Sequence, residues 1–250
     1  MITEYFRPLT LEEALALASR PDAVIIAGGT SVNADAGRSG ANAVDLQALG
    51  LEGVESRNGT IRIGAMTLLQ DLVESDLVPD VLRNLARREA PSTIRNAATI
   101  GGTIGAMDPE SELLAGLLAY GAIVTLATAD SMTDHSLNDI LSDPGLIGRG
   151  IMTAVTAPST GFAAADRTGR TPMDRPIVMA VAHVSAEGAS PGSVRLAMTG
   201  VAPLPVIVDS ERIGDLDPPS DFRGSSEYRR RLASVLAARV LTTVGGGEQA

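Results

Sequence analysis

The pattern of apolar and polar positions predicts a chain of mixed helices and strands. Residues 11–18 place leucine and alanine at the spacing of one helical face. Thr10 and Glu13 precede and open that stretch as a capping box, in which two side chains bond free amides of the first turn. Residues 23–27 form a short apolar run between turn residues and predict a buried strand, and residues 43–46 predict a second strand parallel to it.

The middle and end of the chain continue this alternation of elements. Asn58-Gly59 between two extended segments predicts a hairpin. A second capping pattern, from Thr67 to Gln70, predicts a short helix to about residue 75. Further helices are expected over residues 81–88, 110–120 and 227–241, and further strands over residues 122–127, 151–156, 177–184 and 194–199.

The last predicted helix has an arginine cluster near its start and is followed by a glycine-rich end. The cluster Arg229, Arg230 and Arg231 suits a solvated face or, alternatively, a surface that docks a partner. From Gly245 onward the chain is expected to fray.

Composition narrows the classes of function. The 250 residues carry a net charge of −10, and such a surface repels a phosphate backbone, so nucleic-acid binding is not expected. No apolar run approaches the roughly 20 residues of a membrane span. The first five residues have neither the basic start nor the apolar core of a signal peptide, which favours a cytoplasmic protein.

Cysteine and histidine usage limits the metal chemistry of this chain. It has no cysteine, which excludes disulfides, iron–sulfur ligation and thiol catalysis within it. The two histidines are too few for most transition-metal sites, and no metal site is expected. His183 lies in an apolar strand and suits a packed core residue better than a ligand, whereas His135 lies in a polar segment and is expected to be solvated.

Two glycine pairs carry the candidate chemistry. Gly28-Gly29 follows the first buried strand, and Gly101-Gly102 lies just ahead of the helix expected at 110–120. Both pairs adjoin hydroxyl side chains. Glycine lets the backbone approach a ligand closely, and bare amides beside a helix start suit a phosphate group. Two such pairs predict a diphosphate held between them; the alternative is that both are tight turns. No G-x-G-x-x-G is present, so the nucleotide-binding fold defined by that motif is not favoured.

Several segments in order resemble the FAD-binding medium subunit of the molybdenum hydroxylases, the family of carbon monoxide dehydrogenase and xanthine dehydrogenase. The matching segments are residues 27–30 (AGGT), 95–103 (RNAATIGGT), 109–113 (PESEL), 200–205 (GVAPLP) and 227–232 (EYRRRL). The resemblance implies an α+β, PCMH-type FAD-binding fold. A small α/β subdomain at about 1–50 and a mixed-sheet subdomain at 51–160 would form it. Residues 161–250 would then form a C-terminal domain with a three-stranded sheet and helices.

The same resemblance implies FAD as cofactor and assigns residues to it. Glu112 would accept a hydrogen bond from the ribityl or adenosine part, and Asp108 would lie in the same site. Met152 would lie against the isoalloxazine ring, although a core methionine is an equal alternative, and Arg167 would be a basic residue near the flavin or an exposed one. The diphosphate would be held by Ile26, Ala27, Gly28, Gly29, Thr30, Ser31, Val32, Thr99, Ile100, Gly101, Gly102 and Thr103. No catalytic acid or base is implied, since the cofactor performs the redox step.

The resemblance also implies partners. A large molybdopterin-binding subunit would hydroxylate the substrate, and a small [2Fe–2S] subunit would pass electrons to FAD in this chain, in a heterotrimer or its dimer. Ser31, Thr103 and Glu112 depart from the family's usual residues. Two alternatives therefore stand beside this interpretation: a degenerate subunit that has lost FAD and acts as an assembly scaffold, and a stand-alone FAD oxidoreductase.

Overall fold

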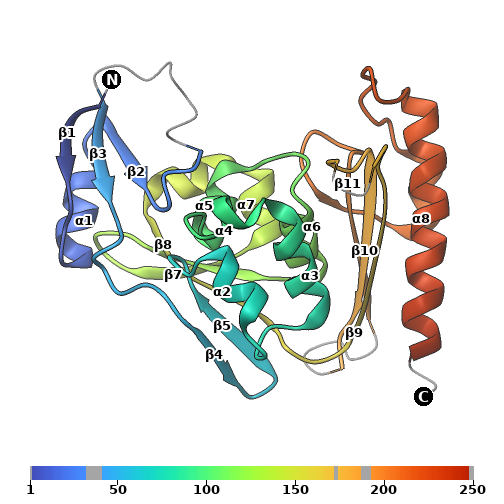
Figure 1. The fold of residues 1–250 in the computed structure, drawn as a ribbon, viewed down its shortest axis with the longest axis horizontal. Coiled ribbons are helices and arrows are strands. Elements are labelled where there is room, and N and C mark those ends of the chain that lie inside the picture. Colours follow the sequence, from blue (N-terminus) through green and yellow to red (C-terminus); the bar gives the residue numbers. More distant parts are fainter. Residues whose placement is uncertain (1, 32–40, 172–173, 187–192, 248–250) are drawn as a thin grey trace.

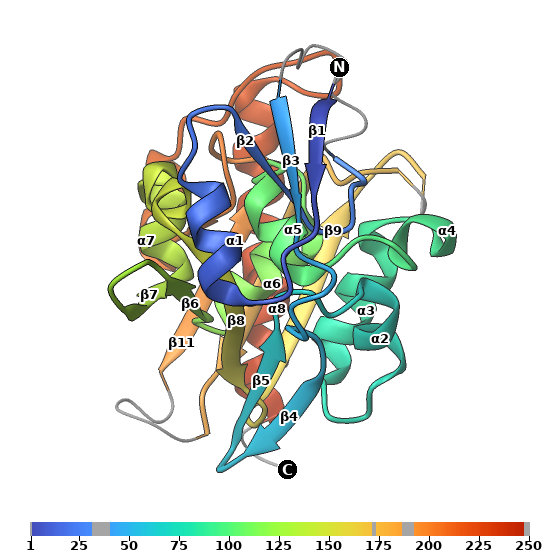
Figure 2. The ribbon, with the colours of Figure 1, turned by 90° about the vertical axis from the view of Figure 1, so that its left-hand side faces the viewer.

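Three groups of elements lie side by side in the computed structural model, which describes residues 2–31, 41–171, 174–186 and 193–247 (Figure 1). The N-terminal group is a parallel three-stranded sheet in the order β1-β3-β2, with one helix beside it (Figure 2). Its elements are β1 (Ile2–Phe6), α1 (Leu11–Ala18), β2 (Ala23–Ile26) and β3 (Ala41–Asp45). The capping box is confirmed, because Thr10 Oγ1 accepts from the Glu13 amide at 3.2 Å and Glu13 Oε2 accepts from the Leu9 amide at 3.1 Å.

The middle group is an antiparallel five-stranded sheet in the order β4-β5-β8-β6-β7, packed against short helices. Its strands are β4 (Val54–Arg57), β5 (Thr60–Gly64), β6 (Ile123–Ala127), β7 (Met132–Ser136) and β8 (Ile151–Pro158). Its helices are α2 (Leu69–Glu74), α3 (Asp80–Glu89), α4 (Ser92–Arg95), α5 (Ile100–Ala106), α6 (Glu112–Ala119) and α7 (Leu137–Ser142), followed by a 3-10 helix, Pro144–Arg149. The predicted hairpin at Asn58-Gly59 is confirmed; both residues take the positive φ that such a turn requires.

The C-terminal group is an antiparallel sheet in the order β12-β11-β10-β9, with a long helix on its outer face (Figure 1). It comprises β9 (Phe162–Thr168), β10 (Val178–Val184), β11 (Val194–Thr199), β12 (Val206–Ile207), a 3-10 helix Ser210–Asp215, and α8 (Ser226–Gly247). Alternate residues of β10 face opposite sides: Val178 and Ala180 pack in the core beneath α8, whereas Met179 and Val181 pack in the core that contains α6. This explains why residues 177–182 are apolar without interruption. The division of the chain near residue 160 stays a prediction.

Several predicted boundaries are wrong for identifiable reasons. The second capping box does not form, because the Thr67 hydroxyl bonds the backbone of Gly53 and α2 begins without a side-chain cap. The second glycine pair is inside helix α5, capped by Thr99, and the helix expected from residue 110 begins at Glu112 behind the cap Ser111. The C-terminal sheet has a fourth, two-residue strand, and α8 extends through Gly247 instead of fraying at Gly245.

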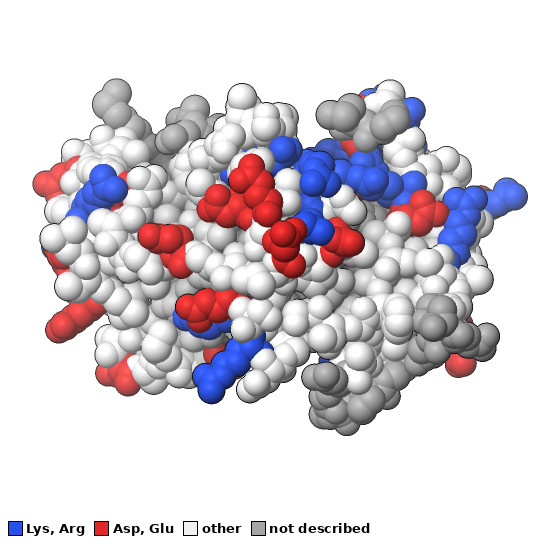
Figure 3. Space-filling model, turned by 60° about the horizontal axis from the view of Figure 1, so that its bottom comes forward, with Lys and Arg blue, Asp and Glu red and all other residues white. Residues whose placement is uncertain are grey.

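The arginine cluster of α8 is only partly solvated. Arg229 is 2% exposed, and its guanidinium donates to the Ile177 carbonyl at 2.6 Å, the Gly200 carbonyl at 3.2 Å and the Asp221 carboxylate at 2.7 Å. This arginine therefore fastens the start of α8 to the sheet and is unavailable to a partner. Elsewhere acidic and basic side chains adjoin across the middle of the face shown in Figure 3. No helix within the described ranges is both long and apolar enough to cross a membrane.

His183 is confirmed as a core residue, at 1% exposure. Its ring stacks on Tyr120 of the turn after α6, with 4.1 Å between ring centroids. Nε2 lies 3.1 Å from the Thr160 carbonyl and so carries the proton, while Nδ1 is buried and forms no hydrogen bond with the described residues. Burial lowers the pKa of His183 despite the bond to Thr160, and the nearby Arg195 guanidinium lowers this pKa further.

We expect this histidine to make the protein acid-sensitive. The unfolded chain takes up a proton at His183 as the pH falls below about 6.5, whereas the folded chain resists it, so the free energy of unfolding decreases from there downward. Urea unfolding between pH 7.5 and pH 5 measures this loss. His183→Phe keeps a ring on Tyr120 and removes the titration; an equal pH slope in both proteins would contradict the assignment.

Candidate functional site

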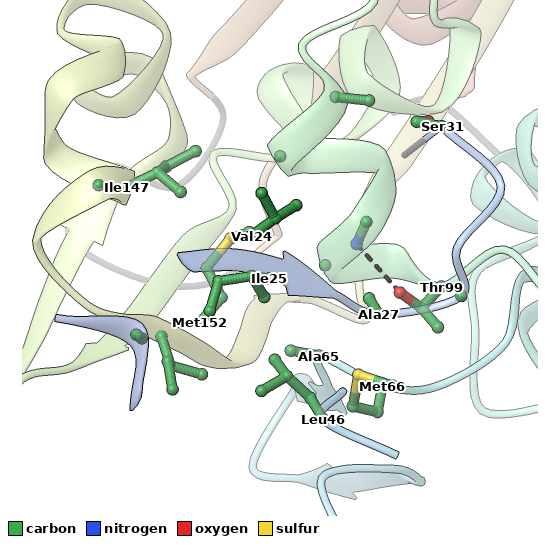
Figure 4. A pocket seen from close by; sticks show the side chains of 18 of the residues that line it. Val24, Ile25, Ala27, Ser31, Leu46, Ala65, Met66, Thr99, Ile147 and Met152 are labelled. Carbon is green, nitrogen blue, oxygen red and sulfur yellow. Dashed lines mark hydrogen bonds between the residues drawn. The ribbon is translucent and has the colours of Figure 1, made fainter. Parts of the chain in front are cut away.

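The two glycine pairs lie close together where the N-terminal group contacts the middle group. Gly28-Gly29 lies in the loop after β2, and Gly101-Gly102 lies in the first turn of α5. Strand β2 ends at Ile26 and delivers Gly28 directly onto the backbone ahead of α5. A Cβ built on Gly28 would lie 1.8 Å from the Ala97 carbonyl oxygen, and one built on Gly102 would lie 3.7 Å from the Ala27 Cβ. Figure 4 shows Ala27 beside Thr99 at this junction. Only glycine at position 28 permits this approach of the two loops.

A cavity of about 1000 Å³ opens beside the junction. Its wall combines both glycine loops with apolar side chains from α1, β2, β8 and the segments around them (Figure 4). Drug-sized ligands occupy cavities of about 300–1000 Å³, so this volume lies at the upper end of that range. Among the residues whose side chains the structure describes, Asp108 is the one ionisable residue that lines the cavity.

Most of the residues assigned to the cofactor lie on this wall. The lining residues are Ala27, Gly28, Gly29, Thr30, Ser31, Thr99, Gly101, Gly102, Asp108 and Met152. Val32 is outside the described residues. The remaining five do not line the cavity: Ile26, Ile100, Thr103, Glu112 and Arg167.

The helical geometry of α5 explains two of these exceptions. Helix α5 turns Gly102, Gly105 and Ala106 toward the cavity. Ile100 is therefore turned into the core, at 0% exposure, and the Thr103 hydroxyl donates to the Thr99 carbonyl at 3.1 Å. A sequence interpretation that treats the stretch as a loop cannot assign these faces.

The amides at the start of α5 are already bonded within the chain. The four acceptors are the Thr67 carbonyl for Ile100 (3.0 Å), the Ala65 carbonyl for Gly101 (2.9 Å), the Thr99 hydroxyl for Gly102 (3.0 Å) and the Thr99 carbonyl for Thr103 (2.9 Å). By contrast, the amides of Gly28, Gly29 and Thr30 donate to no acceptor among the described residues. Free backbone donors therefore come from the first loop, which also presents the hydroxyls of Thr30 and Ser31.

Glu112 and Arg167 lie together, but behind the cavity wall. Arg167 Nη1 is 2.8 Å from Glu112 Oε1, and Arg88 Nη1 is 3.8 Å from Glu112 Oε2. Burial raises the pKa of Glu112, opposed by Arg167 and Arg88. This pair links the first turn of α6 to β9, which gives both residues a structural role in this chain. Ile26 likewise serves the sheet, since its carbonyl accepts from the Leu46 amide at 3.0 Å.

Sequence reasoning missed the apolar half of the cavity. Ala65, Met66, Ile147 and Ile151 line it from segments far apart in the chain (Figure 4). Met107 also lines it, at the left-handed end of α5 with φ 47°. None of these residues has a local pattern that marks it as a site residue, because only the packing of the two groups brings them together.

Known proteins resemble this chain over most of its length. The family model described as the FAD binding domain in molybdopterin dehydrogenase matches residues 1–160. The uncharacterized protein YgfM of Escherichia coli (strain K12) is 32% identical over 255 residues, which cover 95% of each chain. The carbon monoxide dehydrogenase medium chain of Hydrogenophaga pseudoflava is 25% identical over 275 residues, again 95% of each chain.

One further relative and one solved structure complete the comparison. The glyceraldehyde dehydrogenase medium chain of Sulfolobus acidocaldarius is 26% identical over 217 residues, covering 76% of this chain and 77% of that one. A chain of carbon monoxide dehydrogenase from Hydrogenophaga pseudoflava superposes with a TM-score of 0.87 at 23% identity, covering 98% of both chains. That structural likeness supports the α+β, PCMH-type fold.

The contact at Gly28 predicts a measurable cost. Gly28→Ala forces a methyl group into the Ala97 carbonyl, and we expect a loss of about 1–3 kcal/mol in unfolding free energy, together with weaker ligand binding in the cavity. Urea unfolding measures the first effect and FAD titration the second. Gly214→Ala is the matched control, since a Cβ there meets nothing within 4 Å. Equal unfolding midpoints in both variants would show that the loops are not in contact.

Proposed function

The chain belongs to the family of FAD-binding domains of molybdopterin dehydrogenases, and from this membership we propose that it is the electron-transfer subunit of a molybdenum-containing hydroxylase or dehydrogenase complex. Its cofactor is FAD. In this proposal a large molybdopterin-binding subunit oxidises the substrate, and a small subunit with [2Fe–2S] clusters delivers electrons to this chain. An external acceptor then removes them. Two relatives carry the name of medium chains of dehydrogenases, which supports a multi-subunit enzyme.

The observation that carries the proposal is the fit of the cavity to a dinucleotide. The first glycine loop offers free amides and hydroxyls to a diphosphate, as glycine-rich loops do for phosphate groups. Gly102 and Gly105 remove side chains from the facing surface of α5, where a Cβ on Gly105 would lie 3.5 Å from Met152 Cε. The absence of these side chains leaves room for a flat apolar ring system beside α5.

We assign different lining residues to different parts of FAD. We assign the diphosphate to the amides of Gly28, Gly29 and Thr30, with the hydroxyls of Thr30 and Ser31 beside them. Met152 and the apolar wall exclude water from the ring systems. FAD itself supplies the redox chemistry when it is bound.

The lining also favours an electron-transfer subunit over a stand-alone flavoenzyme. An enzyme that works on its own substrate needs an acid or base within reach of the reacting atoms. Within the described residues, no histidine, tyrosine, lysine or glutamate lines the cavity, and Asp108 is held in an ion pair. A site that only receives and releases electrons needs no such group.

We expect the purified chain to bind one FAD and to be reduced by its partners. An absorption spectrum after incubation with FAD and gel filtration tests binding. Reduction of the bound flavin under anaerobic conditions, on adding the molybdenum and iron–sulfur subunits with substrate, tests electron transfer. A chain without flavin that still joins the complex would support the scaffold alternative. Flavin reduction by a small substrate without partners would support the stand-alone enzyme.

A further inference from the structure

Asp108 lies in the turn after α5, which forms part of the cavity wall. It follows Met107, where α5 ends in the left-handed region, and Pro109 after it also lines the cavity. The turn is tight: the Ser111 amide donates to the Asp108 carbonyl at 3.1 Å, and the Glu110 amide donates to Asp108 Oδ1 at 2.8 Å. One carboxylate oxygen is therefore used within the turn.

The second carboxylate oxygen is bonded by an arginine from far along the chain. Arg175 Nη2 lies 3.0 Å from Asp108 Oδ2. The Nη1 of the same guanidinium lies 3.4 Å from the Glu110 carbonyl and 3.5 Å from Glu89 Oε1. Arg175 therefore links the turn that contains Asp108 and Glu110 to the end of α3. It lies beyond residues 1–160, the part that the family model matches.

A second arginine holds the same loop without touching the cavity. Arg223 pairs with the Glu110 carboxylate, and Glu110 does not line the cavity. The two arginines therefore both fasten the loop, but only Arg175 bonds a carboxylate that belongs to the cavity wall. This difference separates an electrostatic role from a purely mechanical one.

The ion pair between Arg175 and Asp108 matters for the cofactor because the Asp108 carboxylate and the diphosphate carry charges of the same sign. A diphosphate is anionic, and no cationic residue lines the cavity among those whose side chains the structure describes. An unpaired carboxylate in the wall would repel a diphosphate, and solvent screens part of this repulsion because 37% of the Asp108 side chain is exposed. Arg175 places a positive charge directly behind that carboxylate and fixes its direction.

We propose that Arg175 is a positioning residue of the FAD site, which neutralises and orients Asp108 so that an anionic dinucleotide can occupy the cavity. The inference rests on the proposed FAD function and deepens it: a residue of the C-terminal third sets the affinity of the family's cofactor domain. It also specifies the role of Asp108, which the resemblance assigned only to the cofactor site. The carboxylate is a charge to be offset and does not attract the cofactor.

Four proteins test this inference by their dissociation constants for FAD. The full chain, Arg175→Ala, Asp108→Asn and the double variant are titrated with FAD by flavin fluorescence at low salt. We expect Arg175→Ala to weaken binding by about tenfold, which corresponds to ~1.4 kcal/mol. Asp108→Asn removes the negative charge of the wall and leaves Glu89 as the carboxylate paired with Arg175, so this variant is expected to bind FAD about threefold more tightly than the full chain, that is, by ~0.65 kcal/mol. The double variant should return to within threefold of the full chain.

The controls separate charge from loop stability. Asn at position 108 can still accept from the Glu110 amide, so the turn is kept. Arg223→Ala removes the other clamp on the loop and should change FAD affinity less than threefold. Arg212→Ala, an exposed arginine paired with Asp215, should change nothing. Raising the salt concentration should reduce the defect of Arg175→Ala, since salt screens a repulsion.

The outcomes that overturn the inference are distinct from failure of the proposed function. If the full chain binds no FAD, the proposed function fails. If it binds FAD but Arg175→Ala binds equally well, or Asp108→Asn fails to restore binding in the double variant, the role of Arg175 is refuted. If Arg175→Ala does not fold, the FAD affinity of Asp108→Asn decides alone. Weaker FAD binding by Asp108→Asn than by the full chain would mean that Asp108 attracts the cofactor, which would refute the inference.

Discussion

The contact between Gly28 and the Ala97 carbonyl is the constraint on which the site depends. A Cβ at this position would lie 1.8 Å from the oxygen, so the approach of the two groups requires glycine there. Because the segment after β2 and the segment before α5 meet this closely, the free amides of the first loop open onto the same cavity as the bare face of α5. Both glycine pairs thus serve one cavity, although only the first offers free backbone donors.

The cavity proposed to hold the anionic diphosphate has few charges of its own. Its wall is made of backbone, hydroxyls and apolar side chains, and the single acidic group that lines it in the described ranges is paired from behind. Two other arginines also pair across the structure, because Arg167 holds Glu112 and Arg229 holds the start of α8. In our proposal Arg175, from the last 90 residues, offsets the one acidic charge of a site built mainly by the first 160.

Local patterns predicted the elements well, and long-range contacts account for the failures. Capping at Thr10, the Asn58-Gly59 hairpin and the buried strand β10 depend on neighbouring residues, and all are confirmed. Strand β2 also forms as predicted, but its residues are only partly buried. The faces of α5 and the bonding of its amides depend on Ala65 and Thr67, which no local pattern links to them. The family resemblance identified the cofactor correctly. It could not show that Glu112 is paired behind the wall, since that pairing depends on Arg167 of β9, which lies far from Glu112 in the sequence.

The central claim is that the first glycine loop holds the diphosphate of FAD with its free amides. Amide resonances of the chain labelled with ¹⁵N, recorded before and after addition of FAD, test this directly. The account predicts large shifts for Gly28, Gly29 and Thr30, and small shifts for Ile100 and Gly101, whose amides already have acceptors. Large shifts at Ile100 and Gly101 with none at the first loop would contradict it.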